Sequence, residues 1–282
     1  MEKNRTHFSY RERLAVEEHV RLSPHLVYEI IRRNGVEELR RPKRALVFSG
    51  IIAGIVITFS FVFKAVFTAC LPAASWTPLL SNLGYTVGFL LVILGHMQLF
   101  TENTITTVVP MFNPVRLRKL LALLRLWGIV LLSNLIGTTL AAWFLLNPYV
   151  INPEFVTALD DIAHHAASFS SQENLWRGIP SGILIASIVW MMPGSKHFAF
   201  LLIMFFTYLI ALGDFTHIVV GSAEMAYWVM KGNADLYDYF VRFLIPTGVG
   251  NIIGGTVIFT LLIYVQAVEE LKRRSLRSED AD

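Results

Sequence analysis

Long apolar runs separated by short charged segments dominate this sequence. Four of the runs are unbroken, namely residues 45–63, 126–146, 178–194 and 243–268. A helix of about 20 apolar residues is long enough to cross the hydrocarbon core of a bilayer. The pattern therefore predicts four intact membrane-spanning helices.

Two further apolar runs, the second and the fifth along the chain, are interrupted by polar residues. The second starts near residue 79, breaks at GHMQLFTENTITTVV from Gly95 onward, and continues as residues 104–115, too few to cross alone. The fifth, residues 198–230, contains LIALGDFTHIVVGSAEM. Unpaired backbone groups are costly in hydrocarbon, so such breaks persist only inside protein or beside a cavity. Two broken helices in corresponding halves indicate a transporter binding site.

The composition agrees with a membrane protein. Of 282 residues, 54% are apolar and 16% charged, with a mean hydropathy of +0.54, whereas soluble domains carry about 25% charged residues. Residues 45–268 are the predicted transmembrane transporter domain, and residues 269–282 a charged cytosolic tail. Residues 1–44 lack a signal peptide's apolar core and form a predicted cytosolic extension.

An amphipathic helix is predicted within the extension. Ser23 followed by Pro24 is typical of a helix start, and Leu26, Ile30 and Ile31 are assigned to one stripe of the helix that would follow. This helix either lies under the membrane domain with a gating or docking function, or is a plain amphipathic tether.

Basic residues next to the apolar runs predict the topology. They occur in residues 40–44, 116–119, Lys196 and residues 272–277. With six crossings, all of these fall on one side. By the positive-inside rule that side is the cytosol, with both termini in it.

The two halves of the chain repeat a short set of residues. Asn134 and Gly137 of the third run match Asn251 and Gly254 of the sixth. Two more pairs occur in the same order: Phe100-Thr101 with Phe215-Thr216, and Gly50/Gly54 with Gly178/Gly182. Three crossings per half require the second half to be inverted. The fold prediction is an all-α membrane protein of six transmembrane helices in a 3+3 inverted repeat, with helices 2 and 5 broken.

His217 is the main candidate functional residue, because an ionisable group in a membrane break indicates a functional site. Its imidazole can donate a hydrogen bond, or a proton, to an anion. Backbone amides of residues 101–104 and 215–217 can donate to the same anion from the helix N-termini. The predicted pathway comprises His217, Thr101, Leu99, Phe100, Phe89, Tyr85, Thr216, Phe215, Asp214 and Ile210. A satisfied core histidine, and ordinary packing of the apolar residues, are the alternatives.

Motifs in the broken and sixth helices resemble the formate–nitrite transporter family. They are Leu99-Phe100-Thr101, Phe215-Thr216-His217, and Ile245-Pro246 followed by Gly250-Asn251-Ile252-Ile253-Gly254-Gly255. The resemblance covers residues 44–264 and implies an aquaporin-like fold in the bacterial inner membrane. It also implies a homopentamer with one pore per protomer. Small-residue pairs such as Gly50/Gly54 and Gly250/Gly254 suit close helix packing and are taken to support that assembly.

The chain departs from that family's usual pattern at several places. Gly182 and Gly221 stand where the family usually has asparagine, and Thr216 where it usually has glutamate. A vestibule lysine of the family has no counterpart near Ala166. The resemblance therefore implies the fold rather than one particular anion.

The predicted function is a channel or transporter for a small monovalent anion or its conjugate acid. Two alternative function classes remain. One is a transport-inactive scaffold of the same fold. The other, an intramembrane enzyme using His217 with Asp214 or Glu224, lacks any nucleophile or metalloprotease motif. No enzyme activity, cofactor, metal or nucleic acid is expected. Cys70 is the single cysteine, and the cluster Asp160-Asp161 with His164-His165 suits a solvated helix face.

Overall fold

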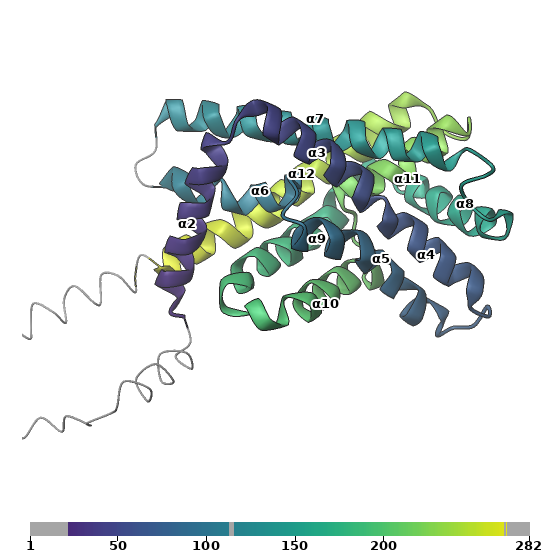
Figure 1. The fold of residues 1–282 in the computed structure, drawn as a ribbon, viewed down its shortest axis with the longest axis horizontal. Coiled ribbons are helices and arrows are strands. Elements are labelled where there is room, and N and C mark those ends of the chain that lie inside the picture. The colour runs from purple at the N-terminus through teal and green to yellow at the C-terminus, as the bar shows by residue number, and fades with distance from the viewer. Residues whose placement is uncertain (1–21, 113–115, 268, 270–282) are drawn as a thin grey trace, which may run out of the picture.

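The structure is a computed structural model that describes residues 22–112, 116–267 and 269. This described part is all-helical, and its helices pack side by side as one bundle, with α2 at one end (Figure 1). The predicted tail, residues 269–282, and the first half of the extension lie almost entirely outside the described residues.

The chain order of the helices is simple. The elements are α2 (Pro24–Arg40), α3 (Lys43–Ile57), α4 (Phe59–Cys70), α5 (Thr77–Leu94), α6 (Phe100–Thr106), η1 (Val109–Phe112), α7 (Leu117–Leu145), α8 (Pro153–Ser168), α9 (Ser171–Met191), η2 (Met192–Gly194), η3 (Lys196–Phe198), α10 (Ala199–Leu212), α11 (Ile218–Met230), η4 (Asp238–Leu244), α12 (Ile245–Ile252) and η5 (Ile253–Thr260).

Five helical segments of the described chain are long and apolar enough to cross a membrane. They are Lys43–Cys70, Thr77–Leu94, Leu117–Leu145, Ser171–Gly194 and Asp238–Ala267, and α10 and α11 are shorter apolar helices. All four runs predicted as intact helices are helical, but each helix begins before its predicted start. Hydropathy locates the apolar part of a helix, whereas caps locate its ends. For example, Ser170 and Glu173 form a capping box that starts α9 outside the apolar run.

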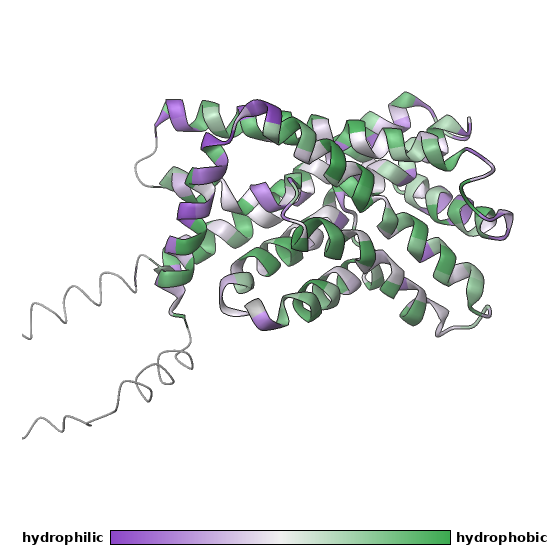
Figure 2. Cartoon of the chain, in the orientation of Figure 1, coloured by the Kyte–Doolittle hydropathy of each residue, from purple (hydrophilic) through white to green (hydrophobic). Residues whose placement is uncertain are grey.

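The outer surface of the bundle is strongly apolar. Phe48, Leu132 and Leu262 are each more than 60% exposed. Figure 2 shows hydrophilic residues on α2 and at helix ends, with hydrophobic residues along most of the bundle. Large exposed apolar surfaces mark contact with a membrane or a partner, so this surface fits a protein that is embedded in lipid.

The small-residue pairs serve contacts within the protomer, which corrects their predicted role in assembly. A Cβ on Gly54 would lie 2.2 Å from the carbonyl oxygen of Asn134 on α7. A Cβ on Gly254 would lie 2.1 Å from the carbonyl oxygen of Ile179 on α9, and one on Gly182 would lie 2.3 Å from the Asn251 carbonyl oxygen. These glycines let α3 approach α7, and α9 approach the last helix. An asparagine at 182 would not fit this packing.

The amphipathic helix of the extension exists, but its buried face agrees with the predicted stripe only at Ile31. Leu26 is 47% exposed, whereas Val27, Tyr28 and Ile31 are buried. This face packs against η1 and α6, and a Cβ on Gly35 would overlap the Thr106 carbonyl oxygen. The tertiary contact, rather than the periodicity of the apolar residues, decides which side is buried.

Helix α8 contains the predicted solvated helix face of Asp160 to His165, but its bounds and its packing were not predicted. Asn152 caps its start by accepting a hydrogen bond from the Glu154 amide at 3.2 Å, and Pro153 occupies its first turn. Helix α8 packs on α4 and α11. It therefore covers one end of the region in which the second chain interruption lies.

Candidate functional site

Two interruptions of the helical chain have the same backbone geometry. Helix α5 ends at Leu94 and α6 begins at Phe100, while α10 ends at Leu212 and α11 begins at Ile218. Each interruption contains a left-handed residue directly after a glycine. These residues are His96, with φ of 50°, and Asp214, with φ of 55°. Non-glycine residues rarely adopt this conformation, and aspartate and histidine are among those that do.

Asn134 of α7 holds the first interruption in place. Its Oδ1 accepts a hydrogen bond from the Phe100 amide at 2.9 Å. Its Nδ2 donates to the carbonyl oxygens of Gly50 at 2.9 Å and Gln98 at 2.8 Å. The buried amide side chain therefore satisfies backbone groups on both sides of the break, which the interior would otherwise leave unpaired.

Asn251 of α12 does the same for the second interruption. Its Oδ1 accepts from the Ile218 amide at 2.9 Å, and its Nδ2 donates to the carbonyl oxygens of Gly178 at 2.9 Å and Thr216 at 3.0 Å. The predicted pairing of Asn134 with Asn251 thus has a physical meaning, because both residues bind the same three kinds of backbone group.

The predicted register between the two breaks is wrong by three residues. Hydrogen bonding matches Phe100 with Ile218, not with Phe215. Leu99 and His217 are then the equivalent residues, and each lies directly before its helix. The pairing by sequence compared residue types, whereas the equivalent positions are those whose backbone amides make the same hydrogen bonds. The Phe215 amide is also unavailable to an anion, because it donates to the Ile210 carbonyl oxygen at 3.0 Å.

His217 joins the two breaks. Its Nδ1 accepts a hydrogen bond from the Val220 amide at 3.3 Å, so in the neutral ring the hydrogen lies on Nε2. Nε2 is 2.9 Å from Oγ1 of Thr101, to which it donates. The ring lies edge-on to Phe89, with 4.9 Å between centroids, and the residue is 2% exposed. His217 is thus a buried, neutral donor that links α11 to α6.

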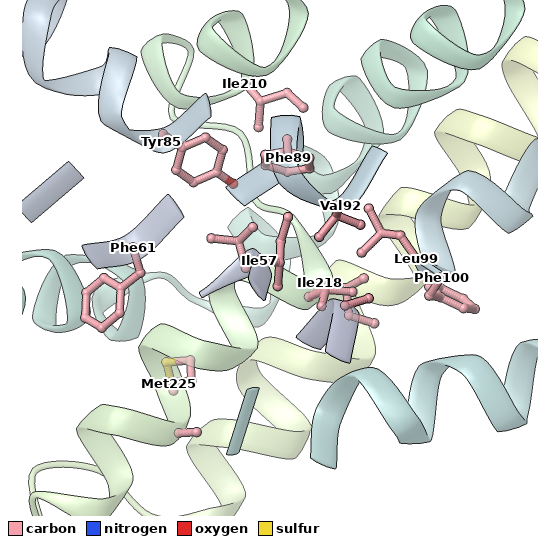
Figure 3. Close-up of a cluster of buried hydrophobic side chains, with 14 of the residues drawn as sticks. Ile57, Phe61, Tyr85, Phe89, Val92, Leu99, Phe100, Ile210, Ile218 and Met225 are labelled. Carbon is pink, nitrogen blue, oxygen red and sulfur yellow. The ribbon is translucent and has the colours of Figure 1, made fainter. Parts of the chain in front are cut away.

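A cavity of about 50 Å³ reaches His217 from the side of α8. One water needs about 10–15 Å³ by this measure, so the cavity can hold a small anion or a few waters. Six predicted pathway residues line it: His217, Thr216, Phe215, Asp214, Ile210 and Tyr85. Figure 3 shows Ile210 above Phe89 and Tyr85 to its left, at the edge of the buried cluster.

The other four predicted residues do not line this cavity. Thr101 and Phe89 contact His217 directly. Leu99 is fully buried, and the Phe100 ring lies edge-on to Trp127 of α7 at 5.7 Å. Figure 3 places Leu99 and Phe100 together beside Val92, within the apolar core. These side chains belong to the packed region next to the histidine rather than to the cavity wall.

Asp214 lies at the mouth of the cavity in a cluster of charged groups. Its carboxylate accepts hydrogen bonds from Arg177 Nη1 at 2.9 Å and from His165 Nε2 at 2.9 Å. Arg177 also donates to the Asp214 carbonyl oxygen at 3.2 Å. The hydrogen bond to Asp214 holds the pKa of His165 above its usual value. These contacts stabilise the left-handed turn and attach α8 and α9 to it.

Neither carboxylate proposed for an enzyme bonds to His217. Asp214 is bound by Arg177 and His165, and both ring nitrogens of His217 are engaged by Val220 and Thr101. The geometry therefore contains no acid–base pair centred on this histidine. Catalysis through such a pair needs a hydrogen bond between its members, directly or through one water.

The acidic and histidine residues of α8 are divided between two contacts. Asp160 accepts from Lys231 at 2.6 Å and from the Tyr227 hydroxyl at 2.9 Å, while His165 binds Asp214. Within the described residues, no three metal-ligating side chains come together. The helix uses these groups to attach to α11 and to the second break.

Two cavity-lining charges escaped the predicted pathway. Lys64 of α4 and Glu224 of α11 both face this cavity. Lys64 directly follows the predicted run of residues 45–63 and precedes further apolar residues, so the signal was an ionisable residue within a longer apolar stretch. Glu224 was considered only as a partner for catalysis. The cavity therefore has more charge than the predicted pathway implied.

An apolar helical bundle in which two chain interruptions meet at a buried histidine defines a membrane transport protein. The chain belongs to the formate/nitrite transporter family, whose model matches residues 25–265. Membership places it among transport proteins and not among enzymes.

Several relatives are similar over most of the chain. "Inner membrane protein YfdC" of Escherichia coli is 40% identical, covering 88% of this chain and 80% of that protein. "Formate channel FocA" of Haemophilus influenzae is 28% identical over 74% of this chain and 82% of its own length.

Solved structures share the fold at lower identity. The "Pentameric formate channel with formate bound" matches with a TM-score of 0.67 and 21% identity, over 80% of this chain and 98% of that one. The "FNT family ion channel" matches with a TM-score of 0.71 and 16% identity, over 85% and 98%.

Proposed function

We propose that the protein is a channel or transporter for a small monovalent anion or its conjugate acid, with one pore in each protomer. The observation that carries the proposal is the contact between His217 and Thr101, at which the two breaks meet beside a cavity. Family membership, and relatives named as formate channels, agree with a formate- or nitrite-like substrate.

The proposed architecture has six crossings in a 3+3 inverted repeat. Helices α5 with α6, and α10 with α11, are the broken second and fifth crossings. The equivalent hydrogen bonds of Asn134 and Asn251 support this assignment, because they tie both interruptions to the last helix of their own half. Both termini are proposed to be cytosolic, in a cell inner membrane, since the basic segments then share one side. The relative named an inner membrane protein supports that location.

The proposed route passes from the α8 side through the cavity to His217. An ion leaving water for an apolar region faces a large desolvation cost. His217 offsets part of it by exchanging the hydrogen bond that its Nε2–H donates to the Thr101 hydroxyl for one to the anion at the end of the cavity. Phe89, Leu99 and Phe100 then form an apolar region that a protonated, neutral acid crosses more easily than its anion does.

Homopentamer assembly is part of the proposal. The structural neighbour described as a pentameric formate channel supports it, as does the apolar outer surface of the bundle. The glycine pairs give it no support, because they are used inside the protomer. Light scattering in mild detergent tests it, and a monomer at every concentration would contradict it.

Flux in proteoliposomes tests the function. The purified full chain should pass formate or nitrite faster than protein-free liposomes do, in a manner that saturates or depends on pH. A correctly assembled protein that passes neither anion, nor any other small monovalent anion offered, supports the transport-inactive scaffold instead.

A further inference from the structure

Two opposite charges face the same cavity without forming an ion pair. Lys64 of α4 and Glu224 of α11 both line it. Among the described residues, no ion pair or hydrogen bond links the Lys64 ammonium or the Glu224 carboxylate to a protein group. Lys64 instead lies 5.9 Å from the centre of the Tyr85 ring. By contrast, Lys231 pairs directly with Asp160, and Arg177 pairs directly with Asp214.

Glu224 is the less expected of the two. It is 9% exposed, so more than nine-tenths of it is buried, and what remains accessible faces the cavity. A buried carboxylate without a partner is costly, and buried charges are generally paired or hydrogen-bonded. In a pore for simple anions it also repels the substrate. An occupant of the cavity that donates to Glu224 would remove both difficulties.

The dimensions and chemistry of the cavity restrict that occupant. A space of about 50 Å³ lined by an ammonium and a carboxylate suits a molecule of a few heavy atoms with an anionic end and a donor end. Formate and nitrite can satisfy Lys64 but carry no donor for Glu224.

We propose that Lys64 and Glu224 form a two-point binding site for small carboxylates that carry a hydrogen-bond donor on the carbon next to the carboxylate. The Lys64 ammonium binds the carboxylate, and Glu224 accepts a hydrogen bond from the substituent, a hydroxyl or an ammonium. The two residues thereby determine specificity at the entrance of the route to His217. The inference rests on the proposed function only in placing the cavity on that route.

Three ligands of equal heavy-atom number test the proposal. Propionate has a methyl group where glycolate has a hydroxyl and glycine an ammonium. Titration calorimetry on the purified full chain in detergent should show that glycolate, glycine or both bind at least about tenfold more tightly than propionate, as expected for a hydrogen bond to a charged group. Glycolate alone would identify a hydroxy acid site, and glycine alone a zwitterion site.

Variants separate the two contacts. Glu224→Leu should remove the preference among the three ligands, because the hydrogen bond to glycolate or glycine is lost, and should bind propionate at least as tightly as the wild type, because the repelling charge is gone. Lys64→Met should weaken all three ligands alike. Lys231→Met, which removes an outer-side lysine outside the cavity, should leave the three affinities as they are. Glu224→Gln, which conserves volume, should weaken glycine binding if Glu224→Leu does not assemble.

Equal binding of the three ligands to the wild type would overturn the proposal, as would a preference that survives Glu224→Leu. A parallel measurement of formate flux keeps this result separate from the proposed function. Flux without ligand preference rejects the two-point site alone. Ligand preference without flux of any anion rejects the transport function and leaves the two-point site standing.

Discussion

The first and second chain interruptions share a backbone but not a chemistry. In both, a glycine and a left-handed residue lead to a new helix whose first amide binds a buried asparagine. The residue before that helix is Leu99 in the first and His217 in the second. The glycine, the left-handed residue and the asparagine contact keep the chain non-helical at both interruptions. Only the second interruption places a polar side chain, that of His217, directly before the new helix. The comparison separates residues needed for folding from residues available for transport.

The largest expected effect concerns the shared part. Asn134→Leu and Asn251→Leu each remove three buried hydrogen bonds and leave backbone partners unsatisfied, at about 1–3 kcal/mol each. Both variants should fail to assemble or should unfold at a much lower temperature, as measured by thermal unfolding in detergent.

Asn82→Leu is the matched control. Asn82 is also buried, but its side-chain oxygen lacks a hydrogen-bond partner among the described residues. This variant should be close to neutral, because no hydrogen bond to that oxygen is lost. If Asn134→Leu is as stable as Asn82→Leu, the asparagines do not hold the breaks.

The second largest expected effect concerns His217, the residue that differs between the two interruptions. His217→Phe removes the donor to Thr101 and should lower anion flux by at least about tenfold, because a hydrogen bond to a charged group contributes about 1.5–3 kcal/mol. His217→Asn retains a donor that cannot titrate, so it should keep flux and lose its dependence on pH.

Leu99→Met at the equivalent position of the first break should change flux little, since it conserves volume and polarity. Flux against external pH for purified, assembled protein compares all three variants. If both His217 variants show the wild-type flux and the wild-type dependence of flux on pH, His217 is a packed core histidine with no part in transport.

The long apolar helices were readable from sequence because hydropathy reports them directly, and the chain interruptions between α5 and α6 and between α10 and α11 lie in the two stretches where polar residues interrupt the apolar pattern. The runs around residues 126–146 and 243–268 are helical as predicted. The register of the repeat was not readable, since Phe100 and Phe215 look alike whereas Phe100 and Ile218 are equivalent. Six of ten predicted pathway residues line the cavity, because they follow one another along the second break or face it from α5 and α10.

The residues that contact Asp214, and the additional charged residues that line the cavity, could not be predicted from the sequence. His165 and Arg177 lie far from Asp214 in sequence, and only the packing of α8 and α9 brings them to it. Glu224 is on α11, two turns after His217, and Lys64 comes from the other half of the chain. No periodicity or motif links such residues, so their meeting depends on tertiary structure.

The smallest expected effect concerns the left-handed residue of each break. Asp214 binds His165 and Arg177, whereas His96 at the equivalent position is exposed. Because the folded pKa of His165 is raised, its protonation stabilises the fold. That contribution is complete below the unfolded value of about 6.5 and is lost as the pH rises through the folded pKa.

Thermal stability of the wild type should therefore decline slightly as the pH rises above about 6.5. The His165 side chain is 53% exposed, so solvent screening keeps the contribution below about 1 kcal/mol. His165→Asn and Asp214→Asn should each flatten this part of the pH profile, whereas His96→Asn should not. Lys64, Arg177 and Glu224 also act on His165 or on Asp214, and the variant His165→Asn separates the contribution of His165 from theirs. If the decline in thermal stability with pH persists in His165→Asn, the pH response belongs to another group. The contact between His165 and Asp214 then makes no pH-dependent contribution to stability.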